Sequence, residues 1–343
     1  MAKQYDVIIV GAGPAGLMCA ETLSKSDLSV LVLEKNEVFG KKICAGGLTR
    51  KGLALLDVPN DIIEHKIHKT AVFSRKKKSQ TDAPEPFVYT VNRVTLGTWQ
   101  KNRLNNTNVE VRNRAKVTQI EPNKVVVNDS DTYQYKYLVG AGGYSSIVRK
   151  YLKIPQEKRL IGLQYTIPDP DVDPRLEIYL NSKRFYSWYA WKFPHHKSFA
   201  VGCVADPQKV SSKKLKANFK KWLEEMEIDI SNAKYESYPI SYDYRGYKFD
   251  NIFLAGEAAG MASGFTGEGI YQSLVSGKTV AETILDSNHN SQEMEDVIKY
   301  NAIQERILNI LIKAGPLRNS LHEMILMLLN NNYIKGKINK GFS

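Results

Sequence analysis

The feature that most constrains the fold is a glycine-rich turn near the N-terminus, Gly11-Ala-Gly-Pro-Ala-Gly16. An apolar, β-branched run from Tyr5 to Val10 precedes the turn and predicts a buried strand. Residues Leu17 to Ser24 have helical spacing, and Val30 to Leu33 predict a second buried strand that ends at Glu34. A strand, a tight turn, a helix and another strand form a βαβ unit, so the sequence predicts an α/β domain of the Rossmann type.

A G-x-G-x-x-G turn in this setting is typical of dinucleotide binding. Gly11 permits the tight turn, Gly13 lets the backbone approach a pyrophosphate, and Gly16 lets the helix pack closely on the strand. The pyrophosphate is expected at the positive end of the helix that begins near Pro14. Glu34 lies roughly twenty residues further on, where a carboxylate accepts hydrogen bonds from ribose hydroxyls. The predicted dinucleotide-binding residues are Gly11, Gly13, Pro14, Ala15, Gly16, Glu34 and Lys35.

Length and composition limit the class of protein. The chain has 343 residues, of which 43% are hydrophobic and 24% charged, as in an ordinary folded protein of two lobes. Its three cysteines, Cys19, Cys44 and Cys203, have neither paired nor metal-type spacing, so we expect no disulfide framework, no metal and a reducing, cytoplasmic setting. No secretory signal is visible, and no apolar run approaches the roughly 18 residues of a membrane span.

The formal net charge of +12 comes from scattered basic residues, with clusters at Arg75–Lys78 and Lys213–Lys221 and a basic C-terminal tail. No recognisable nucleic-acid module surrounds these clusters, so no nucleic-acid partner is expected. A solvated surface explains most of the charge. The remainder is compatible with peripheral attachment to the inner face of a membrane through the C-terminal helices, and with an acidic electron-carrier protein as a partner.

The pattern of elements predicts two domains and a C-terminal extension. Residues 1–155 and 241–290 are expected to form the dinucleotide-binding domain, with an excursion near residues 60–92. Residues 156–240 contain aromatic-rich alternating segments, including Tyr186–Trp191, and predict a second domain built on an antiparallel sheet. Residues 291–343 are expected to be helical.

Resemblance to known flavoproteins identifies the dinucleotide as FAD. Asn251 to Gly277 resembles the C-terminal flavin motif of glutathione reductase-like and hydroxylase-like flavoproteins, with Glu257 where these families usually have Asp. Leu138 to Arg149 resembles the middle motif of the hydroxylase-like branch, although Gly142 replaces its usual Asp. The residues that this resemblance places around the flavin are Arg93, Val117, Gly256, Glu257, Gly267, Gly269 and Ile270.

Two further segments resemble the geranylgeranyl reductase family, which includes digeranylgeranylglycerophospholipid reductases. Lys42 to Leu48 (KICAGGL) is similar to the family's cysteine-glycine loop beside the flavin, which implies cofactor contacts by Cys44, Ala45 and Gly47. Tyr189 to Pro194 (YAWKFP), followed by Gly202, resembles the family's aromatic motif. From the residues alone, core packing of the second sheet is the preferred interpretation of Tyr189, Trp191 and Phe193. The resemblance instead makes them substrate-binding residues in a pocket for an isoprenoid chain.

The resemblance implies a reaction in which hydride from reduced FAD saturates C=C bonds of a polyprenyl chain. The sequence leaves open whether Cys44 only contacts the flavin or is also catalytic as a proton donor. It also leaves open the electron donor, which is either NAD(P)H bound transiently or a ferredoxin- or flavodoxin-type protein. His195, His196, His65 and His68 are predicted to lie on the surface.

Two alternative functions remain from the sequence. The first is a flavin-dependent monooxygenase or halogenase of the same fold, because the Tyr189–Pro194 run partly matches a halogenase motif. The second is a non-catalytic, flavin-bound protein that binds lipid or senses redox state, since Gly142 and Glu257 both depart from the usual pattern.

Overall fold

The first sheet is built around β1 (Lys3–Val10), whose last four residues are all buried. In the computed structural model, which describes residues 3–330, β1 lies between β2 (Val30–Leu33) and β11 (Asp131–Gly140), and the three strands are parallel. Helix α1 (Pro14–Leu23) connects β1 to β2, and the fixed φ of its first residue suits the first helical turn. The predicted βαβ unit and the α/β fold class are therefore confirmed.

Helices and a small antiparallel layer cover the two faces of this sheet. Val7 and Ile9 point to one core, with α1 and α7 (Ile270–Leu285), whereas Ile8 and Val10 point to the other, with residues of β9 and β10. Such two-sided burial explains why the strands are almost continuously apolar. The sheet order is β17-β18-β11-β1-β2-β8, and β10 joins β11 to β9. The remaining strands are β8 (Val109–Arg112), β9 (Val117–Glu121), β10 (Lys124–Val127), β17 (Lys248–Phe249) and β18 (Ile252–Leu254).

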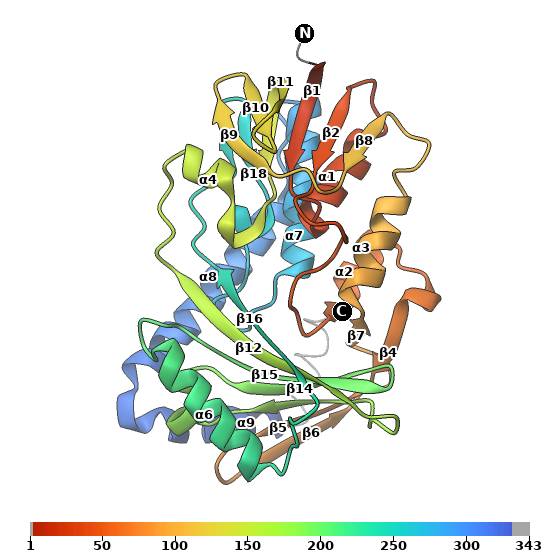
Figure 1. The fold of residues 1–343 in the computed structure, drawn as a ribbon. Helices are drawn as coiled ribbons and strands as arrows, with labels where there is room; N and C mark the ends of the chain where they lie inside the picture. The colour runs from red at the N-terminus through yellow and green to blue at the C-terminus, as the bar shows by residue number, and fades with distance from the viewer. Residues whose placement is uncertain (1–2, 331–343) are drawn as a thin grey trace.

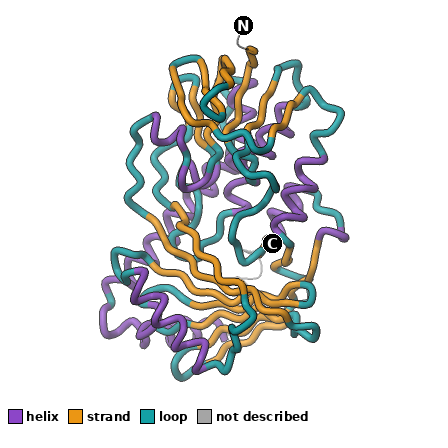
Figure 2. Tube along the Cα trace, in the orientation of Figure 1, coloured by secondary structure: helices purple, strands orange, loops and turns teal. Residues whose placement is uncertain are grey.

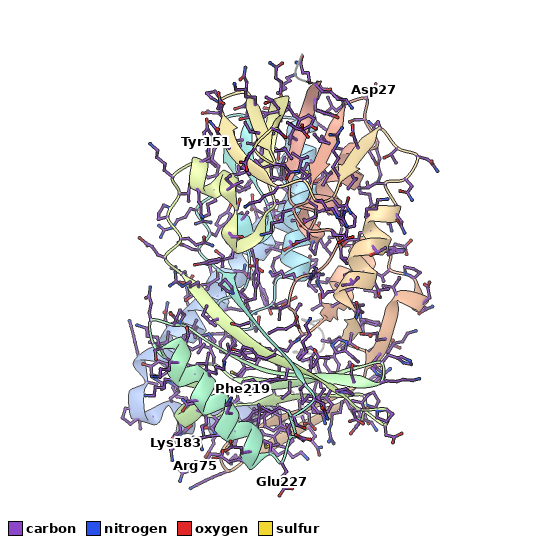
Figure 3. All side chains as sticks on the ribbon, in the orientation of Figure 1. Asp27, Arg75, Tyr151, Lys183, Phe219 and Glu227 are labelled. Atoms are coloured by element: carbon purple, nitrogen blue, oxygen red, sulfur yellow. The ribbon has the colours of Figure 1, made fainter. Side chains whose placement is uncertain are left out.

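The second sheet forms the other lobe, at the bottom of Figure 1. Its order is β16-β12-β15-β14-β13-β5-β6, and every pair is antiparallel except β13 with β5. Helix α6 (Ser212–Glu225) covers one face: its Phe219 (Figure 3) packs on Tyr165 with ring centroids 5.8 Å apart. The strands are β5 (Lys69–Phe73), β6 (Lys78–Asp82), β12 (Arg159–Pro168), β13 (Arg175–Tyr179), β14 (Ala190–His195), β15 (Ser198–Ala205) and β16 (Lys234–Ser241).

The strand expected at Tyr186–Trp191 is wrong for its first four residues, 186–189. Residues Ser182–Phe185 form a short helix, α5, and Tyr186 follows it with a φ of +60°. A residue with positive φ ends the helix, and the strand starts only at Ala190.

The segment expected as an excursion near residues 60–92 divides between two sheets. Its outer parts, β4 (Ile63–Ile67) and β7 (Val88–Val91), pair with each other, and β7 also pairs with β3 (Gly47–Thr49), which gives a three-stranded sheet. Its middle, β5 and β6, forms the edge of the second sheet, 14 residues from Lys69 to Asp82 inclusive. The second lobe is thus assembled from two separate stretches of chain.

The C-terminal helices join the two lobes (Figures 1 and 2). Helix α8 (Gln292–Lys313) packs Met294 and Val297 into a core of the first lobe and Leu308 into the core of the second. A single turn leads into α9 (Arg318–Asn330), and the rest of the predicted C-terminal region, residues 331–343, lies outside the described residues. Within residues 3–330, no helix has both the length and the apolarity needed to cross a membrane. The other helices are α2 (Arg50–Leu56), α3 (Arg93–Asn102) and α4 (Ile147–Tyr151).

Candidate cofactor and substrate site

A cavity of about 650 Å³ opens at the carboxyl ends of the parallel strands in the first sheet. Val10, Leu33, Ala141 and Ala255, each at or just beyond the end of a strand, line it. This edge is where open α/β sheets bind ligands, and the volume is in the range of ligand pockets. The predicted cofactor residues that line the cavity are Gly11, Gly13, Pro14, Ala15, Glu34, Lys35, Arg93, Val117, Gly256 and Glu257.

The glycines of the first turn fill different positions around this cavity. Gly11 has a φ of +109°, which a residue with a side chain adopts at high cost. A Cβ added at Gly16 would lie 2.0 Å from the carbonyl oxygen of Gly11, so this glycine allows α1 to approach β1. A Cβ added at Gly13 would meet nothing within 4 Å, because this residue faces the cavity at the N-terminus of α1. A ligand group here would lie at the positive end of the helix.

Glu34 lies at the end of β2 and is buried. Its carboxylate accepts hydrogen bonds from the backbone N–H of Ala12 at 2.8 Å and from that of Asn36 at 2.9 Å. These bonds fix the carboxylate at the cavity wall, and two oxygens with about four lone-pair sites leave acceptor capacity for ligand hydroxyls.

Arg93 is the first residue of α3, which Asn92 caps by accepting from two backbone N–H groups. Its side chain is buried at the cavity, and its Nε and Nη1 have no hydrogen-bond partner among the described residues. A buried guanidinium without an acceptor is costly, so this position suits a ligand rich in oxygen or carrying negative charge.

Glu257 gives a second unpaired polar atom in the cavity wall. Its Oε1 is paired with the ammonium group of Lys42, while Oε2 is buried and has no partner within residues 3–330. Lys42 also lies over the ring of Tyr238, 4.7 Å from its centroid. Burial, assisted by the nearby carboxylate of Glu257, raises the pKa of Tyr238 to about 12, so its hydroxyl remains neutral and able to donate.

The other predicted cofactor residues lie outside the lining of this cavity: Gly16, Cys44, Ala45, Gly47, Gly267, Gly269 and Ile270. Gly269 caps the N-terminus of α7 with its backbone, Ile270 begins that helix, and Gly267 adopts a φ of +67° just before them. Residues 40–47, here called the Cys44 loop, begin at the cavity and end at the start of β3 in the three-stranded sheet. A Cβ added at Gly47 would lie 2.7 Å from the ring of Phe193.

The predicted aromatic residues gather where the two lobes meet; we call Tyr189, Trp191 and Phe193 the aromatic face. Trp191 is buried and lies edge-on to Tyr189, with ring centroids 6.0 Å apart. The Tyr189 hydroxyl donates to the carbonyl of Thr266, next to Gly267. Gly202 on β15 leaves room for the indole, because a Cβ there would lie 2.3 Å from it. The aromatic face therefore borders both glycine loops that the sequence assigns to the cofactor.

His195 is a residue that the sequence analysis placed wrongly on the surface. It is partly buried at the end of β14, where its Nδ1 lies 2.5 Å from Glu64 Oε2 and its Nε2 lies 3.1 Å from the carbonyl oxygen of Ala45. The period of two that aligns Tyr189, Trp191 and Phe193 also places His195 on their face of the sheet, and this was the signal available in the sequence. By contrast, His196 is exposed.

Comparison with known proteins decides the family and the cofactor. The family model described as FAD binding domain matches residues 4–275. The chain belongs to this family. The cofactor is FAD, and the unpaired atoms of Arg93 and Glu257 and the open space at Gly13 suit a ligand of that kind. The chain is an FAD-dependent oxidoreductase by family.

Named relatives confirm the resemblance to geranylgeranyl reductases. A chloroplastic geranylgeranyl diphosphate reductase of Oryza sativa subsp. japonica is 25% identical over 97% of this chain and 80% of the relative. A digeranylgeranylglycerophospholipid reductase of Methanosarcina acetivorans is 26% identical over 84% of this chain and 76% of the relative.

Solved structures agree on the fold. A geranylgeranyl bacteriochlorophyll reductase-like protein from Thermoplasma acidophilum has a TM-score of 0.80 at 20% identity, covering 97% of this chain and 93% of that protein. The p-nitrophenol 4-monooxygenase of Pseudomonas putida has a TM-score of 0.77 at 14% identity, covering 100% of this chain and 98% of its own. Both neighbours show the fold and, at these identities, nothing more.

Proposed function

We propose that this protein reduces C=C bonds of a polyprenyl chain of the geranylgeranyl type. The observation that carries the proposal is the aromatic face, which borders the Cys44 loop and the Thr266–Gly267 loop at the junction of the lobes. The named relatives, which match most of the chain, support the same substrate class.

In this proposal the first lobe, residues 1–155 and 241–290 without β5 and β6, holds FAD. Gly11 and Gly13 shape the turn at the pyrophosphate, and Glu34 binds ribose hydroxyls. Arg93 and Glu257 supply a donor and an acceptor that have no partner within residues 3–330. The remaining proposed contacts are Pro14, Ala15, Lys35, Val117 and Gly256 at the cavity, Gly16 in the turn, and Cys44, Ala45, Gly47, Gly267, Gly269 and Ile270 in the loops and helix start that lead to the aromatic face.

The second lobe, residues 156–240 with β5 and β6, orients the alkene. A prenyl chain offers no hydrogen bonds, so an apolar pocket recognises it by shape and contact area. When bound and reduced, FAD supplies the hydride for one carbon of the double bond. Tyr189, Trp191 and Phe193 exclude water and hold the chain, and a proton must reach the other alkene carbon.

Three groups near the aromatic face are candidates for the proton donor in this step. Burial raises the pKa of the Tyr189 hydroxyl and, in the loop that precedes α7, the pKa of the Glu268 carboxyl. Cys44, in the loop against the second sheet, is the third group. Replacing each in turn and measuring the pH dependence of turnover separates a proton donor from a residue that only packs.

Anaerobic reoxidation of the bound flavin tests the proposal. The protein is reduced with dithionite, freed of excess reductant and mixed with a geranylgeranyl lipid or, as control, its fully saturated counterpart. We expect the unsaturated lipid alone to reoxidise the flavin, and Trp191→Phe to slow this reaction. A flavin that stays reduced with both lipids, yet hydroxylates or halogenates a substrate in air, would instead establish the monooxygenase or halogenase alternative. A flavin that no donor reduces would favour a lipid-binding or redox-sensing role.

The electron donor is proposed to approach the cavity itself. Lys41, Lys42, Lys116 and Lys150 line its wall together with Arg93, which suits either the phosphates of NAD(P)H or an acidic ferredoxin or flavodoxin. The basic run at Arg75 does not line this cavity; it lies at the opposite end of the molecule from Asp27 (Figure 3). Reduction rates measured with each donor identify it, and only a protein donor should slow steeply as salt rises.

We further propose peripheral contact with a membrane through the C-terminal helices. Helices α8 and α9 and their connection expose a row of large apolar side chains: Tyr300, Ile303, Ile307, Ile310, Leu317, Met324 and Met327. Sedimentation with anionic vesicles tests this contact. Ile303→Ser with Ile310→Ser should reduce binding, whereas absence of binding by the unmodified protein would remove the proposal.

A further inference from the structure

We infer that Glu64 and His195 are positioning residues that hold the Cys44 loop between the flavin cavity and the aromatic face. The inference rests on the proposed function only in taking this loop as part of the FAD site. It adds two residues that the flavin motifs of the sequence do not include.

The Glu64–His195 pair connects three separate segments. Glu64 lies on β4, His195 ends β14, and the imidazole reaches the carbonyl of Ala45 in the loop. The side chains of Glu64 and His195 are 18% and 12% exposed, so water competes poorly for these bonds. Gly46 makes the approach possible, since its φ is +74° and a Cβ there would lie 2.7 Å from His195 Cε1.

Few other bonds hold the centre of the loop. The backbone N–H of Val91 donates to the carbonyl of Gly46 at 3.0 Å. The side-chain amide of Gln164 reaches the carbonyl of Cys44 only at 3.5 Å, the limit of a hydrogen bond. The bond from His195 is therefore the shorter of the two side-chain bonds that tie this stretch to the second sheet within the described residues. Because Gly40 and Lys42 line the cavity, loss of this bond should also change the position of the cavity wall.

The two contacts of His195 set a requirement on protons. Both partners are acceptors, since Glu64 offers a carboxylate and Ala45 a main-chain carbonyl. A neutral imidazole has one N–H and satisfies one of these contacts, whereas an imidazolium donates to both. The loop is therefore held fully while the pair retains two protons, and one contact is lost when the second proton leaves.

Within residues 3–330, Glu64 is the only charged side chain bonded to the ring of His195. Lys42, the lysine of the loop nearest to Ala45, is engaged by Glu257. The titratable side chains on the elements packed around His195 are Glu64, His65 and Lys66 on β4, Tyr89 on β7, Lys41, Lys42 and Cys44 on the loop, Arg175, Glu177 and Tyr179 on β13, Cys203 on β15, and Lys192 and His196 on or next to β14.

Alkylation of Cys44 in the native protein without flavin reports the loop directly. Cys19 and Cys203 are buried in the two cores, so a small maleimide should label Cys44 first. Three variants are compared with the unmodified protein at intervals from about pH 5 to about pH 8, the range that spans histidine titration. His195→Ala removes the pair, Glu64→Gln replaces the carboxylate by an amide, and His196→Ala alters the exposed neighbour as the matched control.

Glu64→Gln is the decisive variant. The amide can donate to Nδ1 of a neutral imidazole whose Nε2–H still donates to Ala45, so both contacts survive without the second proton. We expect His195→Ala to speed labelling about ten-fold at low pH, and His196→Ala to leave it unchanged. The labelling rate of the unmodified protein divided by that of Glu64→Gln should rise with pH, because only the unmodified protein loses a contact when the second proton leaves. Comparing the two proteins at the same pH cancels the effect of thiol ionisation.

FAD affinity gives a second readout on the same variants. The dissociation constant of FAD should increase for His195→Ala and, with rising pH, for the unmodified protein but not for Glu64→Gln. Labelling of His195→Ala at the unmodified rate while its melting temperature is unchanged, or a pH-independent labelling ratio, would overturn the inference. Neither readout involves an alkene, so the inference survives or fails independently of the proposed reaction.

Discussion

At the residue scale, the first turn divides its tasks among glycines that look alike in sequence. The fold needs Gly11 because its φ is positive. It needs Gly16 because a Cβ there would lie only 2.0 Å from the carbonyl oxygen of Gly11. Gly13 has an ordinary φ of −79° and open space beside it. Its glycine is therefore required by the ligand rather than by the folded chain.

This division predicts opposite outcomes for two similar substitutions. Gly13→Ala should leave the melting temperature of the flavin-free protein unchanged but weaken FAD binding about ten-fold or more, because the methyl group occupies the space beside the pyrophosphate. Gly16→Ala should lower the free energy of unfolding by about 3 kcal/mol through overpacking. Thermal melts and fluorescence titration with FAD measure both. A destabilised Gly13→Ala protein with normal affinity would refute the assignment.

Arg93 gives a second test at this scale, because its buried charge has polar atoms without a partner among the described residues, which costs free energy in the flavin-free protein. Arg93→Met should leave the flavin-free protein equally or more stable, yet weaken FAD binding about ten-fold or more, since a hydrogen bond from a charged group is lost. Arg93→Lys, which keeps the charge, serves as control and should weaken binding less. Loss of stability without loss of affinity would make Arg93 a structural residue.

At the scale of elements, β14 and β15 fit together because Gly202 lies opposite Trp191. Gly202→Ala would place a methyl group 2.6 Å from the carbonyl of Leu163 and 2.3 Å from the indole. We expect this change to lower the free energy of unfolding by about 1–3 kcal/mol. It should also displace Trp191, which would change the tryptophan fluorescence of the protein. Gly162→Ala on the neighbouring strand, where the nearest atom is at 3.6 Å, is the matched control and should be nearly neutral. Equal effects of both changes would contradict the packing described.

Helix α9 should respond to acid through His322. Burial, with a smaller effect of Arg318, lowers the pKa of His322 to about 4 in the folded protein, against an ordinary value of about 6.5. As the pH falls, the unfolded chain therefore binds this proton at a higher pH than the folded protein does. The contribution of neutral His322 to the free energy of unfolding is complete above about pH 6.5 and is lost as the pH falls towards 4.

The loss should amount to about 2 kcal/mol of unfolding free energy at pH 5. Denaturant titrations at pH 7.5 and pH 5 measure it, with His322→Asn as the variant that lacks the titrating group. The unmodified protein should lose more stability between these pH values than the variant. Parallel losses in the two proteins would show that His322 does not cause the acid response.

The sequence was most informative where local pattern and chemistry coincide. The βαβ unit, the glycine turn and the strand ending at Glu34 were predicted because each depends on neighbouring residues. The start of β14 was misplaced, since the positive φ of Tyr186 leaves no mark in the apolar pattern. His195 was misread for a different reason: its burial depends on Glu64 and Ala45, which are 131 and 150 residues away in the chain.

At the scale of the whole molecule, the second lobe could not be delimited from sequence. Strands β5 and β6 join it from within the first 155 residues, and the parallel pairing of β5 with β13 connects segments about a hundred residues apart. Alternation predicts a strand but not its partner. This arrangement brings the cavity of one lobe and the aromatic face of the other to a common junction, and α8 holds the lobes together.

The central claim is that this junction presents a prenyl double bond to reduced FAD, and product analysis tests it most directly. A geranylgeranyl lipid is incubated anaerobically with the dithionite-reduced protein and then measured by mass spectrometry. The account predicts a gain of about two mass units for each bond saturated, corresponding to one hydride and one proton. A lipid of unchanged mass, from protein shown to bind and reduce FAD, would contradict it.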